Sequence, residues 1–205
     1  MIDRHMLRLL RPAIDAGALA LHARGINADQ ATLAGFAFGM AAAGSIVMGL
    51  PWPAMALLLI GRALDGLDGA LARLHGATGR GAFLDISLDF LFYAAFPLAF
   101  AIAEPPRNAL AAAVLLAAFV STSTSFLAFA VIAEKCQLKS TAYPTKSFYY
   151  LGGLTEGTET ILCFVSMCLW PVHFAAIAYV YAAMCLVTTL TRLAAGWSNF
   201  GGKDS

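Results

Sequence analysis

Charged residues are scarce in this 205-residue sequence. Only 12% of the residues are charged, whereas 60% are hydrophobic. A soluble domain of this length carries about twice as many charges, so the composition excludes an ordinary soluble domain. The formal net charge of +1 also argues against a nucleic-acid partner, because such proteins gather basic residues on one face.

The sequence also lacks several features that would divide or process the chain. No long linker, low-complexity run or internal repeat is visible, so we expect one domain over residues 1–205. The N-terminal stretch is interrupted by Asp15 and several arginines, which does not fit a cleavable signal peptide. The cysteines lack zinc-type spacing and are interpreted as packing residues or lone thiols; they are Cys136, Cys163, Cys168 and Cys185.

Long apolar runs are what the sequence does contain. Several approach the ~20 residues that an α-helix needs to cross a bilayer. The predicted fold is therefore an all-α integral membrane bundle over residues 30–194. Residues 1–24 mix leucines and arginines in a pattern typical of an amphipathic helix on the membrane surface. The six predicted spans are 30–49, 52–72, 82–103, 108–133, 148–169 and 172–194.

Basic residues predict the orientation of the bundle. In the six-span arrangement nearly all of them fall on one side, Arg107 falls on the other, and Arg62 lies within a span. By the positive-inside tendency, both termini and the residues around Asp65 face the cytoplasm. The basic residues on that side are Arg4, Arg8, Arg11, Arg24, Arg73, Arg80, Lys135, Lys139, Lys146, Arg192 and Lys203.

Four aspartates lie at the ends of the second and third predicted spans: Asp65, Asp68, Asp85 and Asp89. A charge at bilayer depth costs at least ~2.5 kcal/mol, so such a cluster needs a compensating cation. Each pair shares one helix face, being three or four residues apart. The short, glycine-rich connection LHGATGRG makes the two helices antiparallel neighbours. Carboxylate oxygens suit Mg²⁺, Mn²⁺ or Ca²⁺, and we predict a divalent-metal site.

The spacing of these residues closely resembles the signature of the CDP-alcohol phosphotransferase (CDP-alcohol phosphatidyltransferase) family. The pattern is D-x2-D-G-x2-A-R, a short gap, then G-x3-D-x3-D. The gap between Arg73 and Gly81 is seven residues here, one shorter than the usual pattern. The eight matching residues are Asp65, Asp68, Gly69, Ala72, Arg73, Gly81, Asp85 and Asp89.

The resemblance implies a division of labour among these residues. Asp65, Asp68 and Asp85 would ligate Mg²⁺ or Mn²⁺, with two ions expected, and Asp89 would be the general base and a second-metal ligand. The donor would be CDP-diacylglycerol or a related CDP-alcohol, and the enzyme a homodimer in a bacterial inner membrane. The pocket that binds the donor's nucleotide and diphosphate would be lined by Gly69, Ala72, Arg73 and Gly81.

A second segment, Gly25–Thr32, partly matches a motif that family members carry before the first span. Thr32 persists, but the usual Pro-Asn pair is Ala28-Asp29 here. Asp29 and Thr32 are therefore further candidates for donor binding. The alternative is structural, with Asn27 or Asp29 capping the first helix of the bundle.

Two glutamates, Glu156 and Glu159, are the other notable acids. Together with Lys146 they are candidates for binding a small alcohol acceptor, because carboxylates can bind hydroxyl or ammonium groups and a lysine can bind a phosphate. The alternatives are an interhelical hydrogen-bond cluster for the glutamates and positive-inside bias for the lysine.

Three functions fit these features. The first is transfer of a phosphatidyl group from CDP-diacylglycerol to a small alcohol with release of CMP. The second, within the same family, is transfer of a phospho-amino-alcohol from a CDP-alcohol to diacylglycerol. The third is a divalent-cation transporter, which is disfavoured because the acids lie at one end of the spans, whereas a transport path places ligands near the midplane.

Overall fold

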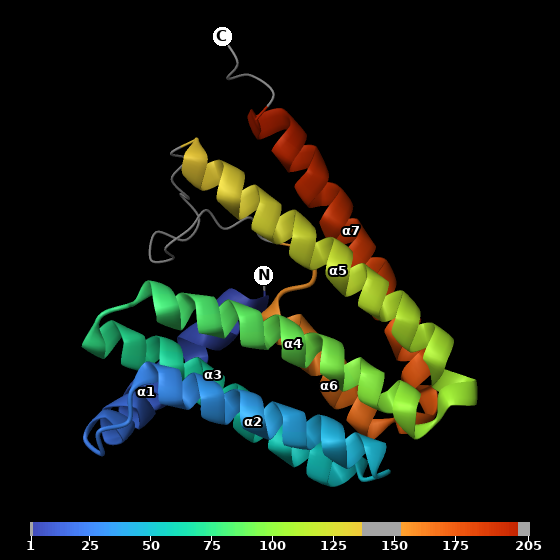
Figure 1. Cartoon of the computed structure of the whole chain (residues 1–205), viewed down its shortest axis with the longest axis horizontal. Helices are drawn as coiled ribbons and strands as arrows, with labels where there is room; N and C mark the ends of the chain where they lie inside the picture. Colours follow the sequence, from blue (N-terminus) through green and yellow to red (C-terminus); the bar gives the residue numbers. More distant parts are fainter. Residues whose placement is uncertain (1, 137–152, 201–205) are drawn as a thin grey trace.

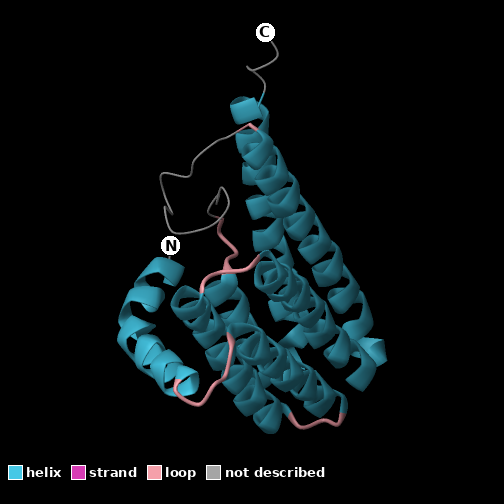
Figure 2. Ribbon diagram, turned by 60° about the vertical axis from the view of Figure 1, so that its left-hand side comes forward, coloured by secondary structure: helices cyan, strands magenta, loops and turns pink. Residues whose placement is uncertain are grey.

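The computed structural model of the chain describes residues 2–136 and 153–200, with side chains from residue 11 onward except that of residue 75. All the regular secondary structure in these ranges is helical (Figure 2). A short 3₁₀ turn, Pro171–His173, precedes the last helix. The α-helices are α1 (Ile2–His22), α2 (Ala28–Val47), α3 (Pro51–His75), α4 (Gly79–Ala103), α5 (Pro105–Lys135), α6 (Gly157–Leu169) and α7 (Phe174–Phe200).

The helices form two groups (Figure 1). Helices α2, α3 and α4 lie alongside one another with α6 beside them, and α1 crosses one end of this group. Helices α5 and α7 pack along each other and extend past the first group. The α1–α2 and α3–α4 connections meet at one end of the molecule, so the C-terminal end of α3 faces the N-terminal ends of α2 and α4.

Four of the six predicted spans are confirmed as helices that are long and apolar enough to cross a membrane. They are α2, α4, α5 and the continuous stretch Pro171–Phe200. Helix α3 has 25 residues, yet it is not among them, because Arg62, Asp65 and Asp68 place three charges in two turns of its second half. The count of six spans is therefore not confirmed.

The predicted span 148–169 differs most from the structure. Its helix begins only at Gly157 and has 13 residues, too few to cross a bilayer alone. Residues 148–152 lie outside the described residues. The backbone amides of Leu154 and Thr155 donate to the Thr188 hydroxyl of α7 at 3.2 and 3.1 Å. These bonds hold the segment before Gly157 in a non-helical conformation.

Local sequence signals set the helix ends near the acidic cluster. Asn27 caps α2 in a reciprocal capping box with Gln30, so Asn27 and not Asp29 is the cap. Helix α3 ends at Gly76, whose φ of +92° favours glycine. Thr78 then caps α4 by accepting a hydrogen bond from the Gly81 amide at 3.0 Å.

Glycines and aromatic rings bring α2, α3 and α4 close together. A Cβ atom on Gly61 of α3 would lie 2.9 Å from the Gly35 carbonyl oxygen of α2, so only glycine fits there. Gly39 of α2 packs against the Phe92 ring of α4 in the same way. Phe92 belongs to the main core, where Phe96 stacks on Phe164 of α6 with ring centroids 4.6 Å apart.

Helix α1 packs on the bundle with part of its predicted amphipathic face. Ala18 is buried, and Ile14 and Leu21 contact the small cluster that contains Leu71 of α3. Leu19 remains 56% exposed. The helical conformation of residues 2–22 is observed, whereas the amphipathic character of the helix and its position on a membrane surface stay predictions.

Candidate active site

Three of the four motif aspartates meet where α3 and α4 face each other. Asp65 and Asp68 of α3 and Asp85 of α4 each place one carboxylate oxygen within 4.8 Å of the others. Asp68 is buried, at 7% exposure, and the other two are half-buried. This convergence follows because the short connection turns the chain back and both α3 and α4 pack against α2.

Thr32 of α2 fixes the most buried of these acids. Its hydroxyl donates a short hydrogen bond to Oδ2 of Asp68 and also lies 3.0 Å from the Ala28 carbonyl oxygen. Thr32 can reach Asp68 because α2 and α3 approach closely at Gly35 and Gly61. The sequence placed Thr32 among donor-binding candidates; the structure places it against the acidic cluster.

Asp89, the fourth aspartate, is oriented by a different partner. The Nη1 atom of Arg62 lies 2.7 Å from Oδ1 of Asp89 and 3.4 Å from Oδ2 of Asp65. The guanidinium also lies over the Phe92 ring, 4.8 Å from its centroid. In the sequence, Arg62 stood out only as a charge within a predicted span. The signal for its role was a charge within an apolar span, because a charge at that depth requires a buried counter-ion.

The three converging carboxylates fit a divalent cation. Two oxygens that share one Mg²⁺ at about 2.1 Å lie about 3 to 4.2 Å apart. Oxygens within 4.8 Å of one another therefore need only small side-chain rotations to bind one ion. An all-oxygen donor set favours Mg²⁺, Mn²⁺ or Ca²⁺ over softer metals.

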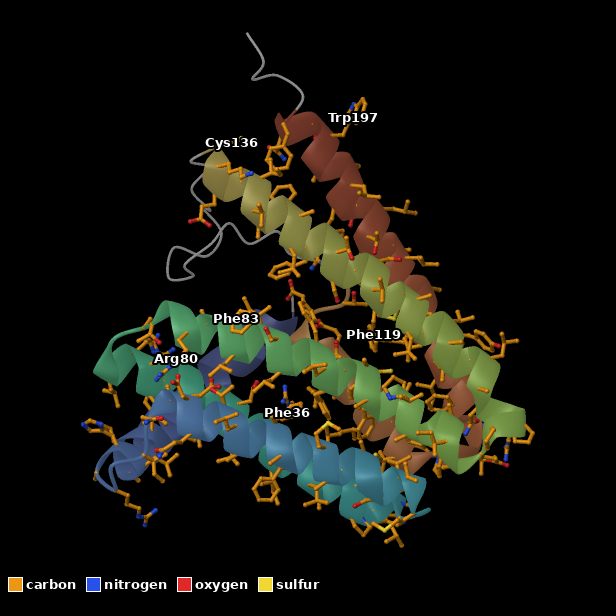
Figure 3. All side chains as sticks on the ribbon, viewed as in Figure 1. Phe36, Arg80, Phe83, Phe119, Cys136 and Trp197 are labelled. Carbon is orange, nitrogen blue, oxygen red and sulfur yellow. The ribbon has the colours of Figure 1, made fainter. Side chains whose placement is uncertain are left out.

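A first cavity of about 280 Å³ opens beside the cluster, between α2, α3 and α4. It is lined by Asp68 and Asp85 and by five residues that the sequence assigned to donor binding: Asp29, Thr32, Gly69, Ala72 and Gly81. Gly81 keeps this wall open, because a Cβ atom there would lie 3.2 Å from Oδ1 of Asp29. Asp29 itself pairs with Arg80 at 2.6 Å, and Figure 3 shows Arg80 near the start of α4.

Arg73 is the one predicted donor residue that does not line this cavity. Its side chain is 62% exposed and lies 3.6 Å from Asp15 of α1. It still lies near the cavity wall, since a Cβ atom on Gly69 would lie 3.9 Å from its Nη1 atom. Arg73 therefore sits at the rim, where its guanidinium links α3 to α1.

A second cavity, of about 500 Å³, lies on the other side of Asp85. Asp85 and Asp89 form one wall, and the opposite wall includes Glu156, which precedes α6, and Thr160 in its first turn. The aromatic side chain of Phe119 on α5, labelled in Figure 3, contributes to the cavity. Its ring centroid lies 6.3 Å from that of Tyr93 on α4. Asp85 is shared by both cavities, so the acidic cluster lies at their junction.

The two glutamates separate in space. Glu156 is buried and lines the second cavity, whereas Glu159 lines a different cavity between α6 and α7, with Trp170 and Tyr181. Of the two glutamates, therefore, Glu156 alone shares a cavity with the aspartates. Lys146, the third acceptor candidate, lies outside the described residues.

Arg192 of α7 is a second residue that sequence reasoning missed. It was counted among the basic residues on the cytoplasmic side of the bundle, yet it is only 6% exposed and lines the second cavity. Its Nη1 donates to the Thr122 carbonyl oxygen at 3.2 Å, and its guanidinium lies 5.4 Å from the Phe126 ring centroid. The five consecutive serine and threonine residues of α5, at positions 121–125, were the signal that a polar partner lies opposite.

Known proteins resemble this chain over most of its length. The family model described as CDP-alcohol phosphatidyltransferase matches residues 26–193, which confirms the resemblance drawn from the eight-residue motif. The inner membrane protein YnjF of Escherichia coli (strain K12) is 50% identical over 200 residues, 98% of this chain and 96% of that protein.

Solved structures of Mycobacterium tuberculosis phosphatidylinositol phosphate synthase (PgsA1) share the fold. The form with CDP-DAG bound aligns with a TM-score of 0.70 and 22% identity, covering 90% of this chain and 93% of that one. The complex with manganese and citrate has the same score and identity, and covers 90% and 88%. At this identity the likeness shows a common architecture.

Proposed function

Because the chain belongs to the CDP-alcohol phosphatidyltransferase family, we propose that it transfers a phosphatidyl group from CDP-diacylglycerol to a small alcohol and releases CMP. The family consists of transferases, so the third hypothesis, a cation transporter, is set aside. The observation that carries the proposal is the position of the acidic cluster at the junction of two cavities that share Asp85. A transfer reaction needs such a junction, since donor and acceptor must meet at one phosphorus atom.

The first cavity is the proposed donor site. Small residues at Gly69, Ala72 and Gly81 allow the diphosphate to approach the backbone closely. Arg73 at the rim would bind a phosphate oxygen, exchanging its long contact with Asp15 for a stronger one. Related support is that the M. tuberculosis synthase with this fold was solved with CDP-DAG bound.

Asp65, Asp68 and Asp85 would bind Mg²⁺ or Mn²⁺. When bound, the ion neutralises charge on the diphosphate and on the CMP leaving group. Thr32 keeps the Asp68 carboxylate in one orientation toward the other two acids. The second ion expected from the resemblance would have to compete with Arg62 for Asp89.

Asp89 is the proposed general base. It faces the second cavity with Asp85, so an alcohol bound there could donate its proton to the Asp89 carboxylate as its oxygen attacks the phosphorus atom. The new phosphorus–oxygen bond forms while the bond to CMP breaks, and CMP leaves through the first cavity. Glu156 would orient the acceptor through its hydroxyl or ammonium groups.

The membrane setting follows from the four long apolar helices and the likeness to an inner membrane protein. We propose an integral inner-membrane enzyme with both termini and the acidic cluster on the cytoplasmic side. The acyl chains of the donor would then stay in the lipid while its headgroup enters the first cavity.

An acceptor screen tests the proposal. Purified protein in liposomes receives radiolabelled CDP-diacylglycerol, Mg²⁺ or Mn²⁺, and in turn serine, glycerol 3-phosphate, inositol phosphate and amino alcohols. We expect CMP release and a new phospholipid, identified by mass spectrometry, with one acceptor. Asp85→Asn should abolish the product, whereas Glu104→Gln, at the opposite end of α4, should not. Product formation only from a CDP-amino-alcohol and diacylglycerol would establish the second hypothesis instead.

The two glutamates provide a matched test of the acceptor site. Glu156→Gln should raise the acceptor KM by about 10-fold or more, the scale of a lost charged hydrogen bond. Glu159→Gln, three residues away in another cavity, should change the KM far less. Equal effects of the two substitutions would contradict the assignment of the second cavity to the acceptor.

A further inference from the structure

Arg62 lies inside the acidic cluster and not at its edge. Its side chain is 11% exposed and belongs to α3, one turn before Asp65. Nη1 lies 2.7 Å from Asp89 Oδ1 on α4 and 3.4 Å from Asp65 Oδ2. One guanidinium therefore bridges the two helices that carry all four motif aspartates.

The surroundings restrict this guanidinium to its present place. The Phe92 ring lies against it, 4.8 Å from the guanidinium carbon to the ring centroid. Phe92 is itself fully buried and packs against Gly39 of α2. If Arg62 moved, its permanently charged guanidinium would lose the contact with Asp89 without gaining contact with water.

The four aspartates thus divide into two unequal sets. Asp65, Asp68 and Asp85 converge within 4.8 Å, while Asp89 already has a cation at hydrogen-bond distance. A divalent ion that used Asp89 as a ligand would have to approach this fixed positive charge, whose own side chain is only 11% exposed. Repulsion between the two cations and the loss of the ion pair both oppose that arrangement.

We propose that Arg62 occupies the place of a second cation, so that the site binds one divalent ion, at Asp65, Asp68 and Asp85, and leaves Asp89 as a proton acceptor. Arg62 is then a positioning residue, because it acts by fixing the orientation and charge environment of Asp89. This inference rests on the proposed function and departs from the two-ion expectation that the family resemblance implied.

Mn²⁺ titration of the purified protein in detergent, followed by electron paramagnetic resonance, tests the inference without turnover. The wild-type protein should bind one Mn²⁺ per chain, and Arg62→Gln should bind two, because Asp89 is released. Arg62→Lys retains a cation and should stay at one. The control Arg80→Gln breaks another arginine–aspartate pair nearby, that with Asp29, and should also stay at one.

A second arm does not depend on the folding of an Arg62 variant. In the wild-type background, Asp89→Asn should leave one bound Mn²⁺ with its Kd changed less than about threefold. Asp68→Asn removes a direct ligand and should weaken Mn²⁺ binding at least ~10-fold. That is the smallest usual effect of removing a residue that only hydrogen-bonds to a metal ligand. Two ions in the wild-type protein, one of them lost in Asp89→Asn, would overturn the inference, as would an unchanged count of one in folded Arg62→Gln.

These results also separate the inference from the proposed function. A wild-type count of two leaves the transferase proposal intact and removes only the role of Arg62. Absence of any Mn²⁺ binding at millimolar concentration would remove the metal site on which both rest.

Discussion

Asp68 is the most buried of the four motif aspartates, and its carboxylate has a partner from a third helix. Thr32 donates to one oxygen of Asp68, which leaves lone pairs of the other oxygen for a cation. Asp65 and Asp85 complete the set from two helices. The three carboxylates thus reach one point from two helices.

Asp65→Asn, Asp68→Asn and Asp85→Asn should each abolish the Mg²⁺- or Mn²⁺-dependent transfer reaction. An amide keeps the shape of the carboxylate but leaves the phosphate charge incompletely neutralised in a site of low effective dielectric constant. The measurement is CMP release by protein in liposomes, with membrane insertion confirmed by extraction. Near-normal activity in any two of these variants would contradict the metal-site assignment.

Thr32→Val should lower the affinity for Mn²⁺ by about 10-fold, because the orientation of the Asp68 carboxylate is lost while side-chain volume is kept. Thr32→Ser preserves the hydroxyl and should retain most of the affinity. The comparison is made by Mn²⁺ titration of both variants. Equal weakening in Thr32→Ser would mean that the methyl packing of Thr32, and not its hydrogen bond, supports the site.

Asp89→Asn should lower the transfer rate by roughly 10²–10⁴-fold, the usual contribution of a general base. Binding of the CDP-lipid should survive, because the three other aspartates keep their positions. The rate is measured by single-turnover CMP release and the binding by equilibrium titration. Substantial recovery of the rate in excess Mn²⁺ would instead show that Asp89 acts chiefly as a metal ligand.

At the scale of the helices, the site depends on how closely α2 and α3 approach each other. Gly35 and Gly61 face each other with almost no space between them. This contact lies one turn from Thr32 on α2 and one turn from Asp65 on α3. Separating the two helices here would draw Thr32 away from Asp68.

Gly61→Ala should therefore destabilise the protein by about 1–3 kcal/mol, the usual cost of overpacking. The added Cβ would lie 2.9 Å from the Gly35 carbonyl oxygen, which is backbone and cannot rotate away. Gly44→Ala on α2 is the matched control, since nothing lies within 4 Å of its Cβ position. Gly44→Ala should be neutral or stabilising, because alanine favours a helix by up to ~1 kcal/mol.

Thermal unfolding in detergent, followed by circular dichroism, compares the two variants. A lower Tm for Gly61→Ala together with weaker Mn²⁺ binding would link the helix contact to the site. Equal Tm values for the two variants would show that α2 and α3 can separate without cost.

The sequence predicted most helices well because apolar composition and caps are local properties. Asn27, Pro51 and Pro105 mark helix starts that the chain itself encodes. The late start of α6 was not predictable in this way, since it depends on Thr188, more than 30 residues away, accepting the amides of Leu154 and Thr155. A hydropathy pattern does not indicate that partner.

The same distinction applies to the site. The four aspartates were recognisable from their spacing, and the short connection made the two helices neighbours. The pairing of Arg62 with Asp89, 27 residues apart, depends on how α3 and α4 both pack on α2, where Gly61 meets Gly35 and Phe92 meets Gly39. Similarly, only the assembled fold turns Arg192 inward to the second cavity.

At the scale of the whole molecule, the outer surface is unusually apolar. Large hydrophobic side chains such as Leu110, Val120, Val180 and Leu190 are each at least 64% exposed on α5 and α7. Such a surface suits lipid tails and also leaves broad helix faces available to a second chain. Gly35 and Gly39, which form a GxxxG pair on α2, pack within the chain against Gly61 and Phe92.

We still expect a homodimer, formed through these outward apolar faces. Native mass spectrometry in a mild detergent should show a species of two chains, each of 21.6 kDa. Because each chain has its own complete cluster of Asp65, Asp68 and Asp85, dissociation by harsher detergent should lower stability before it removes Mn²⁺ binding. A spectrum that contains only monomers across several mild detergents would count against the dimer. Loss of Mn²⁺ binding in step with dissociation would show that the partner chain supports the site.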